Sequence, residues 1–308
     1  MLRIIYLLVL VIFFGCQKNN QVQNKSEQHY FLVSHAGPGD PFWNIVFSGA
    51  KEAQRVLGIN LQILAPETAN DIARQVELLD AAIAAKPQGI ALSIPDDQAF
   101  SRSLKEAQKQ GIPVIAFNTH PNAHAKANNP YLAFIGMDDI IAGQKLAGEI
   151  WATNGLKDRV VVAIHQAGHV GLERRYLGIK NELEKNNIMV DKLDVSVDAA
   201  QAQQIIQSYL QKNPNTSAIF FVGSFGIHAA SRSLQKEHPK LLQASFDITP
   251  LTLEQIKNNA LSMSVDQQPF MQGYMALIEL DLKSRFALAP ADINTGMAFI
   301  QKNNIGVR

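Results

Sequence analysis

The sequence predicts an α/β protein with two doubly wound domains, in which each parallel sheet is covered by helices on both faces. Three observations predict it. Short apolar runs alternate with amphipathic stretches at a period of roughly 25–30 residues. The runs form two groups of five, separated at Gly136-Met137, which favours two sheets over one large sheet. About 280 residues follow a polar N-terminal segment, a length that suggests two domains.

The strand-like runs are short, apolar and followed by turn residues or by amphipathic stretches. In chain order they are Tyr30–Ser34, Leu61–Leu64, Gly89–Ile94, Pro113–Phe117, Tyr131–Ile135, Val160–Ile164, Met189–Val195, Ala218–Val222, Leu241–Phe246 and Leu261–Val265. Between them, apolar side chains recur at spacings of three and four. Such spacing at Ile72, Val76, Leu79 and Ile83 places these side chains on one face of a helix.

Helix ends and a late apolar run complete the pattern. Gly58, Gly111 and Gly155 stand where helices are expected to end in a left-handed residue. Ile293–Ile300 is a further apolar run after the tenth strand, and we expect it to cross between the two domains.

The N-terminus predicts export. One cation at Arg3 precedes a short apolar run that ends at Gly15, and Cys16 is the single cysteine of the chain. Roughly 20 apolar residues are needed to span a bilayer, so residues 1–16 are predicted to be a signal peptide. The segment resembles the lipobox of bacterial lipoproteins, although Phe13-Phe14 departs from the usual pattern. An ordinary signal peptide or a retained apolar tail, with an incidental cysteine, is the alternative.

Residues 17–28 are rich in Gln, Asn, Lys and Ser and contain one aliphatic residue, Val22. They cannot bury enough surface to fold and are predicted to be a flexible tether. With lipid on Cys16, the tether would hold the folded body at a membrane surface, so we expect a protein anchored in the periplasm or at the cell surface.

Composition and motifs exclude several function classes. A formal net charge of +1 and the absence of a basic stripe argue against binding to nucleic acid. No phosphate-cradling glycine loop and no H-E-x-x-H motif is present, so we expect no cofactor and no metal. His165 and His169 are four apart, but Ala167-Gly168 between them indicates a loop, and two loop histidines that line a cleft are favoured over a metal site.

Asp40-Pro41-Phe42-Trp43 follows the first predicted strand and begins a helix. Ligands bind at this carboxyl edge of open α/β sheets. Aromatic faces beside a carboxylate suit a small polyhydroxylated ligand, because the rings stack on C–H faces and the carboxylate accepts O–H donors. The alternative is that Phe42 and Trp43 are core residues that anchor the helix to the sheet.

Polar residues occupy other strand-to-helix junctions. Asn118 and Asp247 each follow a strand, Gln267 follows Val265-Asp266, and Arg175 lies early in the helix after the sixth strand. Because such junctions meet at one edge of a sheet, these side chains can converge on one ligand. The alternatives are helix N-caps for Asn118 and Asp247, a surface ion pair for Arg175, and a surface position in a hinge for Gln267.

The chain from residue 29 onward resembles the ribose-type sugar-binding proteins of ABC importers, which are type I periplasmic binding proteins. The residues that carry the resemblance are Asp40-Pro41-Phe42-Trp43, Gly111-Ile112-Pro113-Val114-Ile115 with Asn118, Ile135-Gly136-Met137-Asp138 with Gly143, Arg175-Tyr176-Leu177-Gly178, Ser245-Phe246-Asp247 and Gln267-Gln268-Pro269. The resemblance implies two Rossmann-like lobes joined by three hinge crossovers. It implies an N-terminal lobe of residues 29–137 plus 268–296 and a C-terminal lobe of residues 138–267 plus 297–308.

The resemblance also implies the roles of the candidate residues. Phe42 and Trp43 would clamp a sugar ring, while Asp40, which stands where Asn is usual, would contact it together with Arg175, Asp247 and Gln267. Asn118 stands where the family commonly has an Asp. Its side-chain amide can donate hydrogen bonds as well as accept them, whereas a carboxylate only accepts. Further residues expected to line the pocket are His35, Thr119, Met137, Ala199, Gly223 and Ser224. Because Thr119, Ala199 and Gly223 are smaller than their usual counterparts, we expect a roomier pocket than a ribose receptor has.

These expectations lead to one function and two rivals. We expect a monomeric extracytoplasmic receptor that captures a monosaccharide, a polyol or a related small neutral ligand and delivers it to an ABC permease. A sensor that presents the ligand to a membrane kinase or chemoreceptor is the first rival. An exported sugar-active enzyme is the second; it would need two carboxyl groups. Asp40 and Asp247 are the candidates, but we expect neither to have apolar neighbours suited to raising its pKa.

Overall fold

The structure is a computed structural model that describes residues 28–223 and 228–306. The predicted signal peptide with Cys16, almost all of the predicted tether and the candidate pocket residue Ser224 lie outside these ranges. Within these ranges no helix combines the length and the apolar character needed to cross a membrane.

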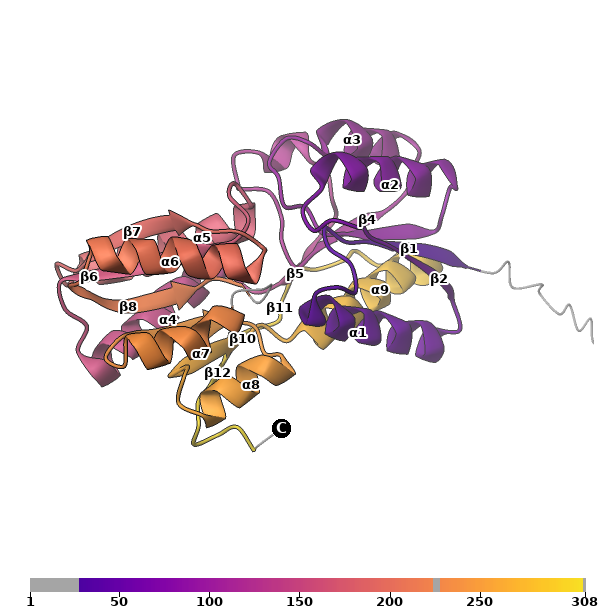
Figure 1. Cartoon of the computed structure of the whole chain (residues 1–308). Helices are drawn as coiled ribbons and strands as arrows, with labels where there is room; N and C mark the ends of the chain where they lie inside the picture. Colours follow the sequence, from indigo (N-terminus) through magenta and orange to yellow (C-terminus); the bar gives the residue numbers. More distant parts are fainter. Residues whose placement is uncertain (1–27, 224–227, 307–308) are drawn as a thin grey trace, which may run out of the picture.

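The first lobe contains a six-stranded parallel sheet with the order β11-β5-β4-β3-β1-β2. In that order the strands are Ile293–Asn294, Phe134–Gly136, Val114–Phe117, Gly89–Leu92, His29–Val33 and Asn60–Leu64. Helices α1 (Pro41–Leu57) and α9 (Pro269–Phe286) cover one face, and α2 (Ile72–Ala84) and α3 (Ser101–Lys109) cover the other (Figure 1). A short 3₁₀ helix at Lys126–Asn128 lies between β4 and β5. Each face of the sheet therefore has its own apolar core.

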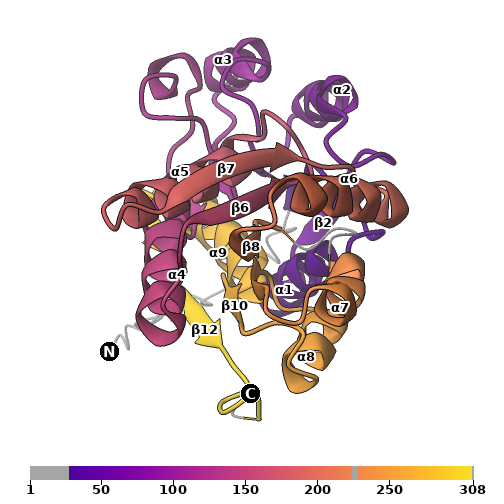
Figure 2. The same ribbon diagram turned by 60° about the vertical axis from the view of Figure 1, so that its left-hand side comes forward.

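The second lobe repeats this plan with the order β12-β10-β9-β8-β6-β7. In that order the strands are Ala298–Ile300, Met263–Asp266, Leu242–Phe246, Thr216–Phe221, Arg159–Ile164 and Met189–Asp194. Helices α4 (Asp139–Asn154) and α5 (Val170–Glu184) cover one face. Helices α6 (Ala199–Lys212), α7 (His228–Glu237) and α8 (Pro250–Lys257) cover the other, and Figure 2 shows α7 and α8 side by side. The edge strand β12 is antiparallel to β10, and every other pair is parallel.

The predicted fold class is confirmed. All ten predicted runs form strands, and the late run Ile293–Ile300 contains two more, one in each sheet. Gly58, Gly111 and Gly155 have φ values of 63°, 72° and 66°, as expected of residues that end helices in the left-handed conformation.

The chain passes between the lobes three times, as the resemblance implied. The first passage, at Met137-Asp138, joins β5 to α4, and the second, at Gln267-Gln268, joins β10 to α9. The third, at residues 295–297, joins β11 to β12. Each passage is only two or three residues long, so relative motion of the lobes requires few backbone dihedral changes.

Close helix crossings position one of the candidate residues. A Cβ atom on Gly143 of α4 would lie 2.3 Å from the carbonyl oxygen of Arg175 on α5, and a Cβ atom on Gly178 would lie 2.1 Å from that of Ile140. Only glycine permits this approach of the two backbones. The crossing brings Arg175 next to Asp139 at the start of α4.

Candidate functional site

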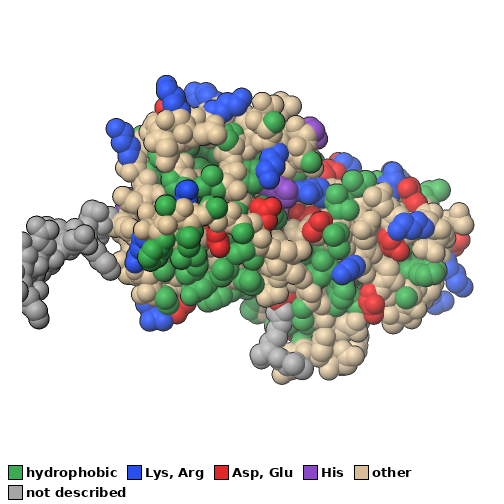
Figure 3. Space-filling view, turned by 180° about the vertical axis from the view of Figure 1, so that it is seen from behind, with side chains coloured by type: hydrophobic (Ala, Val, Ile, Leu, Met, Phe, Trp, Pro, Cys, Tyr) green, Lys and Arg blue, Asp and Glu red, His purple; other side chains and the backbone are tan. Residues whose placement is uncertain are grey.

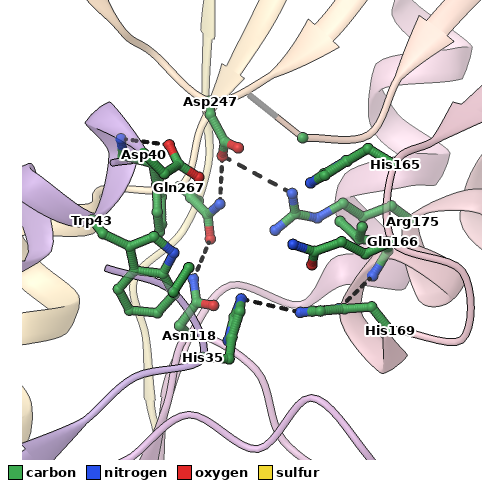
Figure 4. Close-up of a pocket in the computed structure, with 14 residues that line it drawn as sticks. His35, Asp40, Trp43, Asn118, His165, Gln166, His169, Arg175, Asp247 and Gln267 are labelled. Atoms are coloured by element: carbon green, nitrogen blue, oxygen red, sulfur yellow. Dashed lines mark hydrogen bonds and ion pairs between the residues drawn. The ribbon is translucent and has the colours of Figure 1, made fainter. Parts of the chain in front are cut away.

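The carboxyl ends of the two sheets face each other across a cavity between the lobes (Figure 4). The lining residues come from turns and helix starts of both lobes and from one passage between them. They are His35, Ala36, Asp40, Phe42, Trp43, Asn118, His165, Gln166, His169, Leu172, Arg175, Gly223, Asp247 and Gln267. The free volume is about 40 Å³, which holds on the order of a few water molecules. A larger ligand can therefore enter only when the lobes or the lining side chains move apart.

Asp40, Phe42 and Trp43 form the first wall. Asp40 is the N-cap of α1, and its Oδ1 accepts from the backbone N–H of Phe42 at 3.0 Å. The Trp43 side chain is 2% exposed and meets the ring of Phe117 edge-on at 6.0 Å between centroids. Phe42 and Trp43 thus belong to the apolar core of the first lobe and also line the cavity. The core interpretation of these aromatics is confirmed, while the clamp on a ligand stays a prediction that their place at the cavity allows.

Asn118 and Asp247 leave the ends of β4 and β9 in the left-handed conformation, with φ values of 63° and 74°. Asn and Asp tolerate this conformation better than other side chains that carry a Cβ. The N-cap alternative is wrong for both residues: α8 is capped by Thr249, and the 3₁₀ helix after β4 begins after Ala125. Both side chains face the cavity instead.

Arg175 is buried, with 5% of its surface exposed, so the surface ion-pair alternative is wrong. Its Nε donates to Asp139 Oδ1 at 2.8 Å, its Nη1 donates to the Val222 carbonyl oxygen at 2.8 Å, and its Nη1 lies 4.0 Å from Asp247 Oδ1. The guanidinium also stacks over the ring of Phe246, 4.7 Å from its centroid. One cation is therefore held between two carboxyl groups at the wall of the cavity.

Burial raises the pKa of Asp139 and that of Asp247, while the nearby Arg175 guanidinium opposes the rise. The expectation that the surroundings of Asp247 would leave its pKa unraised is wrong. The error arises because the fold buries Asp247, and removal of its carboxyl group from water disfavours the charged form.

Gln267 lies in the second passage between the lobes and is 2% exposed, so the surface alternative for it is wrong. Its Nε2 donates to Asp247 Oδ1 at 2.5 Å, and its Oε1 accepts from Asn118 Nδ2 at 3.3 Å. The amide of Gln267 thus joins a polar residue of the first lobe to one of the second (Figure 4).

The turn between β6 and α5 supplies the wall opposite Trp43. His165, Gln166 and His169 face the cavity from this turn (Figure 4). The two histidines were expected to line a cleft, but Gln166 and Leu172 were missed by sequence reasoning. The signal that could have found Gln166 is its place directly after a strand end, next to His165.

His35 and His169 meet across the cavity, one from each lobe. Their Nε2 atoms are 3.2 Å apart, and His35 Nδ1 lies 3.0 Å from Ser93 Oγ. Burial, with His165 and Arg175 nearby, lowers the pKa of His35 to about 3, and burial lowers the pKa of His169 well below its ordinary value.

Two further contacts bridge the lobes on the same side. The backbone N–H of Val170 donates to the Pro95 carbonyl oxygen at 3.0 Å, and Arg174 Nη1 lies 3.0 Å from His120 Nε2. Figure 3 shows charged and histidine side chains gathered where the lobes meet. The lobes are thus in contact on one side of the cavity.

Three candidate residues do not line the cavity. Thr119 is buried, Met137 belongs to the apolar core of the second lobe, and Ala199 is the partly exposed first residue of α6. Gly223 does line it, but a Cβ atom there would lie 2.4 Å from Cε1 of His165. The imidazole of His165 fills the space that the small residue was expected to open. A pocket roomier than that of a ribose receptor stays a prediction, without the space that Gly223 was expected to supply.

Within the described residues, no group of three or more His, Cys, Asp and Glu side chains is arranged to hold a metal ion. The polar side chains of the cavity are instead bound mostly to one another. The arrangement offers hydrogen-bonding groups and ring edges to a small molecule.

Comparisons with known proteins agree with this geometry. The family model described as a periplasmic binding protein domain matches residues 31–280. The xylose/arabinose-binding protein of Sulfolobus acidocaldarius is 28% identical over 296 residues, which cover 87% of this chain and 73% of that protein. A periplasmic sugar-binding protein of an ABC sugar transporter from Legionella pneumophila is 40% identical, with a TM-score of 0.82 and coverage of 87% and 99%. A carbohydrate transporter protein from Acidothermus cellulolyticus in complex with myo-inositol is 26% identical, with a TM-score of 0.81 and coverage of 91% and 96%.

Proposed function

The chain belongs to the periplasmic binding protein family, and on that premise we propose that it is an extracytoplasmic receptor for a monosaccharide, a polyol or a related small neutral ligand. The ligand is enclosed between the lobes and delivered to an ABC importer by hinge closure. The names of the relatives support the class of ligand, since they bind xylose and arabinose, ribose, galactose or allose.

The observation that carries the proposal is the convergence of Trp43, Asn118, Arg175, Asp247 and Gln267 on one cavity from distant parts of the sequence. Rings that stack on C–H faces and polar groups that pair with hydroxyls are the two needs of a sugar. The pairing of the cavity's polar groups with one another favours binding over catalysis.

The charges favour a neutral ligand. Arg175 is the cation that lines the cavity among the described residues, and Asp139 binds it directly while Asp247 lies 4.0 Å away. A ligand carboxylate or phosphate would compete with two protein carboxyl groups for this one guanidinium. A hydroxyl group brings no charge and can pair with either partner.

Attachment to a membrane is a separate part of the proposal. Cys16 is the residue that would carry lipid, and residues 17–28 would be the tether between the lipid and the first lobe. Mass spectrometry of the N-terminal peptide of the protein from membranes should find a lipidated Cys16. A Cys16→Ser variant that stays in the membrane fraction would contradict this part.

Mass spectrometry of the small molecules released when the purified protein is denatured tests the ligand class. We expect one neutral polyhydroxylated molecule at up to one per chain. A protein that releases a charged metabolite instead, at the same stoichiometry, would contradict the proposal.

A further inference from the structure

A second amide lies behind Asn118, outside the cavity. Gln272, in the first turn of α9, is 0% exposed and does not line the cavity. Its Nε2 donates to the backbone carbonyl oxygen of Gln267 at 2.9 Å and to Gln267 Oε1 at 3.1 Å. Its Oε1 accepts from Asn118 Nδ2 at 3.0 Å.

The direction of these hydrogen bonds is fixed by the backbone. A carbonyl oxygen cannot donate, so the group that Gln272 presents to the Gln267 carbonyl must be its NH₂ group. The same carbonyl oxygen accepts from Thr295 Oγ1 at 3.0 Å. The other end of the Gln272 amide, its Oε1, then faces Asn118 and requires a donor there. Rotating the Gln272 amide by 180° would bring two carbonyl oxygens together.

The side chain of Asn118 is oriented as a result. Its Nδ2 donates to Gln272 Oε1 at 3.0 Å and lies 3.3 Å from Gln267 Oε1, so both N–H groups are used. Among the described residues none donates to Asn118 Oδ1, and Figure 4 shows this oxygen turned away from the bonded amide nitrogen, toward the cavity. An asparagine that could offer a donor or an acceptor therefore offers only an acceptor.

We propose that Gln272 is a positioning residue that makes Asn118 an acceptor toward the ligand, so that this point of the cavity selects a ligand hydroxyl that donates. The proposal rests on the proposed function, because it assigns a role in binding a polyhydroxylated ligand. Asn118 then has the hydrogen-bonding character of a carboxylate without its charge. A ligand that places a fluorine, an ether oxygen or a carbonyl oxygen next to Asn118 Oδ1 brings two acceptors together. Such a ligand should therefore bind more weakly.

The orientation can be tested without any ligand. We expect Gln272→Leu, which keeps the apolar volume but removes the amide, to increase the solvent exchange rate of the Asn118 side-chain NH₂ protons by roughly threefold or more. Nuclear magnetic resonance measures this rate, with the signal assigned through Asn118→Ala. Met271→Leu, one residue away on the same helix and outside the network, is the matched control and should leave the rate unchanged.

Selectivity is the second readout. The wild type and both Leu variants are titrated with D-ribose, D-xylose, D-arabinose, D-galactose and myo-inositol, and then with the single deoxyfluoro analogues of the tightest binder. A fluorine cannot donate, so we expect one analogue to bind the wild type roughly tenfold more weakly than its parent. Gln272→Leu leaves Asn118 Nδ2 only its longer contact of 3.3 Å with Gln267 Oε1. The Asn118 amide then rotates more readily, so that penalty should shrink several-fold.

The outcomes are distinguishable. An unchanged exchange rate in Gln272→Leu overturns the positioning role, whatever the ligand. Equal weakening of the parent sugar and all its analogues also overturns it, because a merely structural role would produce that result. A faster exchange rate with no binding of any sugar or polyol overturns the proposed function and the assignment of a ligand hydroxyl to Asn118, while the orientation of the amide stands.

Discussion

His35 of the first lobe and His169 of the second place their Nε2 atoms 3.2 Å apart, so one imidazole must donate to the other. Two imidazolium rings could not make this contact, since both would be donors and both would carry positive charge. Burial lowers the pKa of each ring, to about 3 for His35 and well below the ordinary value for His169. Contact between the lobes is thereby coupled to the protonation of this pair.

We predict that ligand affinity falls as the pH falls below about 6.5, the ordinary pKa of histidine. When the lobes separate, His35 and His169 regain this pKa and bind protons, whereas in the closed form they remain neutral to much lower pH. Acid therefore stabilises the open form, and each histidine weakens closure by up to about tenfold per pH unit in this range. His120, whose pKa is lowered to about 4 by burial and then by Arg174, adds in the same direction.

Calorimetric titrations between about pH 5 and pH 8 check this prediction. His169→Gln keeps a polar side chain of similar size but cannot be protonated, so its affinity should depend less steeply on pH. The same slope in the variant and the wild type would contradict the role of the histidine pair.

Arg175→Met should lower the free energy of unfolding by roughly 3–5 kcal/mol at neutral pH, because it leaves Asp139 and Asp247 buried without their cation. Burial raises the pKa of both carboxyl groups, so their charged forms are the unfavourable ones. Protonation on going to about pH 5 removes that charge, and the loss of stability should become smaller there. Urea unfolding at both pH values measures it.

The matched control is Arg232→Met, which removes a cation from an exposed ion pair with Glu254. Such pairs contribute up to about 1 kcal/mol, so this variant should stay close to the wild type. An equal loss for Arg175→Met at both pH values would show that the two carboxyl groups do not respond as described.

Trp43→Leu should weaken ligand binding roughly tenfold or more, because it removes the indole that borders the cavity. Phe47→Leu is the control: Phe47 lies on the same helix with its ring centroid 5.9 Å from that of Trp43, but it does not line the cavity. Both variants lose aromatic area from the same core, so thermal unfolding separates loss of packing from loss of binding. Equal affinity in the two variants would place the ligand elsewhere.

Gly223→Ala should weaken binding by roughly fivefold or more, as overpacking of a filled site does. The new Cβ atom would lie 2.4 Å from His165 Cε1 and push that ring into the cavity. Gly37→Ala, whose Cβ atom would have its nearest contact at 3.5 Å, should bind as the wild type does. A Gly223→Ala variant with unchanged Kd, measured by titration, would mean that the position of His165 does not matter to the ligand.

Local patterns predicted the strands because their apolar runs are separated by amphipathic stretches. They did not resolve β11 and β12, since strands of two and three residues have no period of their own. The rule that strand ends gather at one edge of a sheet correctly placed Asn118 at the edge of the first sheet and Asp247 at the edge of the second, and the cavity lies between these edges. It could not indicate their left-handed backbone or the raised pKa of Asp247, which depend on neighbours from other segments.

The small residues were the main source of error in the predicted site. Gly223 alone suggests open space, but the space is taken by His165 from another strand end. Gln272 gave no signal because a glutamine in the first turn of a helix is usually exposed. Packing between segments far apart in the sequence, and between lobes, decides these points.

Calorimetric titration of the unfolded and refolded protein, freed of any bound molecule, tests the central claim most directly. The titrants are D-ribose, D-xylose, D-arabinose, D-galactose, myo-inositol and, as a charged comparison, gluconate. We predict saturable binding of at least one neutral sugar or polyol at one site per chain, and no binding of gluconate. Binding of gluconate alone, or no binding of any neutral member by the refolded protein, would contradict the claim that the cavity encloses a neutral polyhydroxylated ligand.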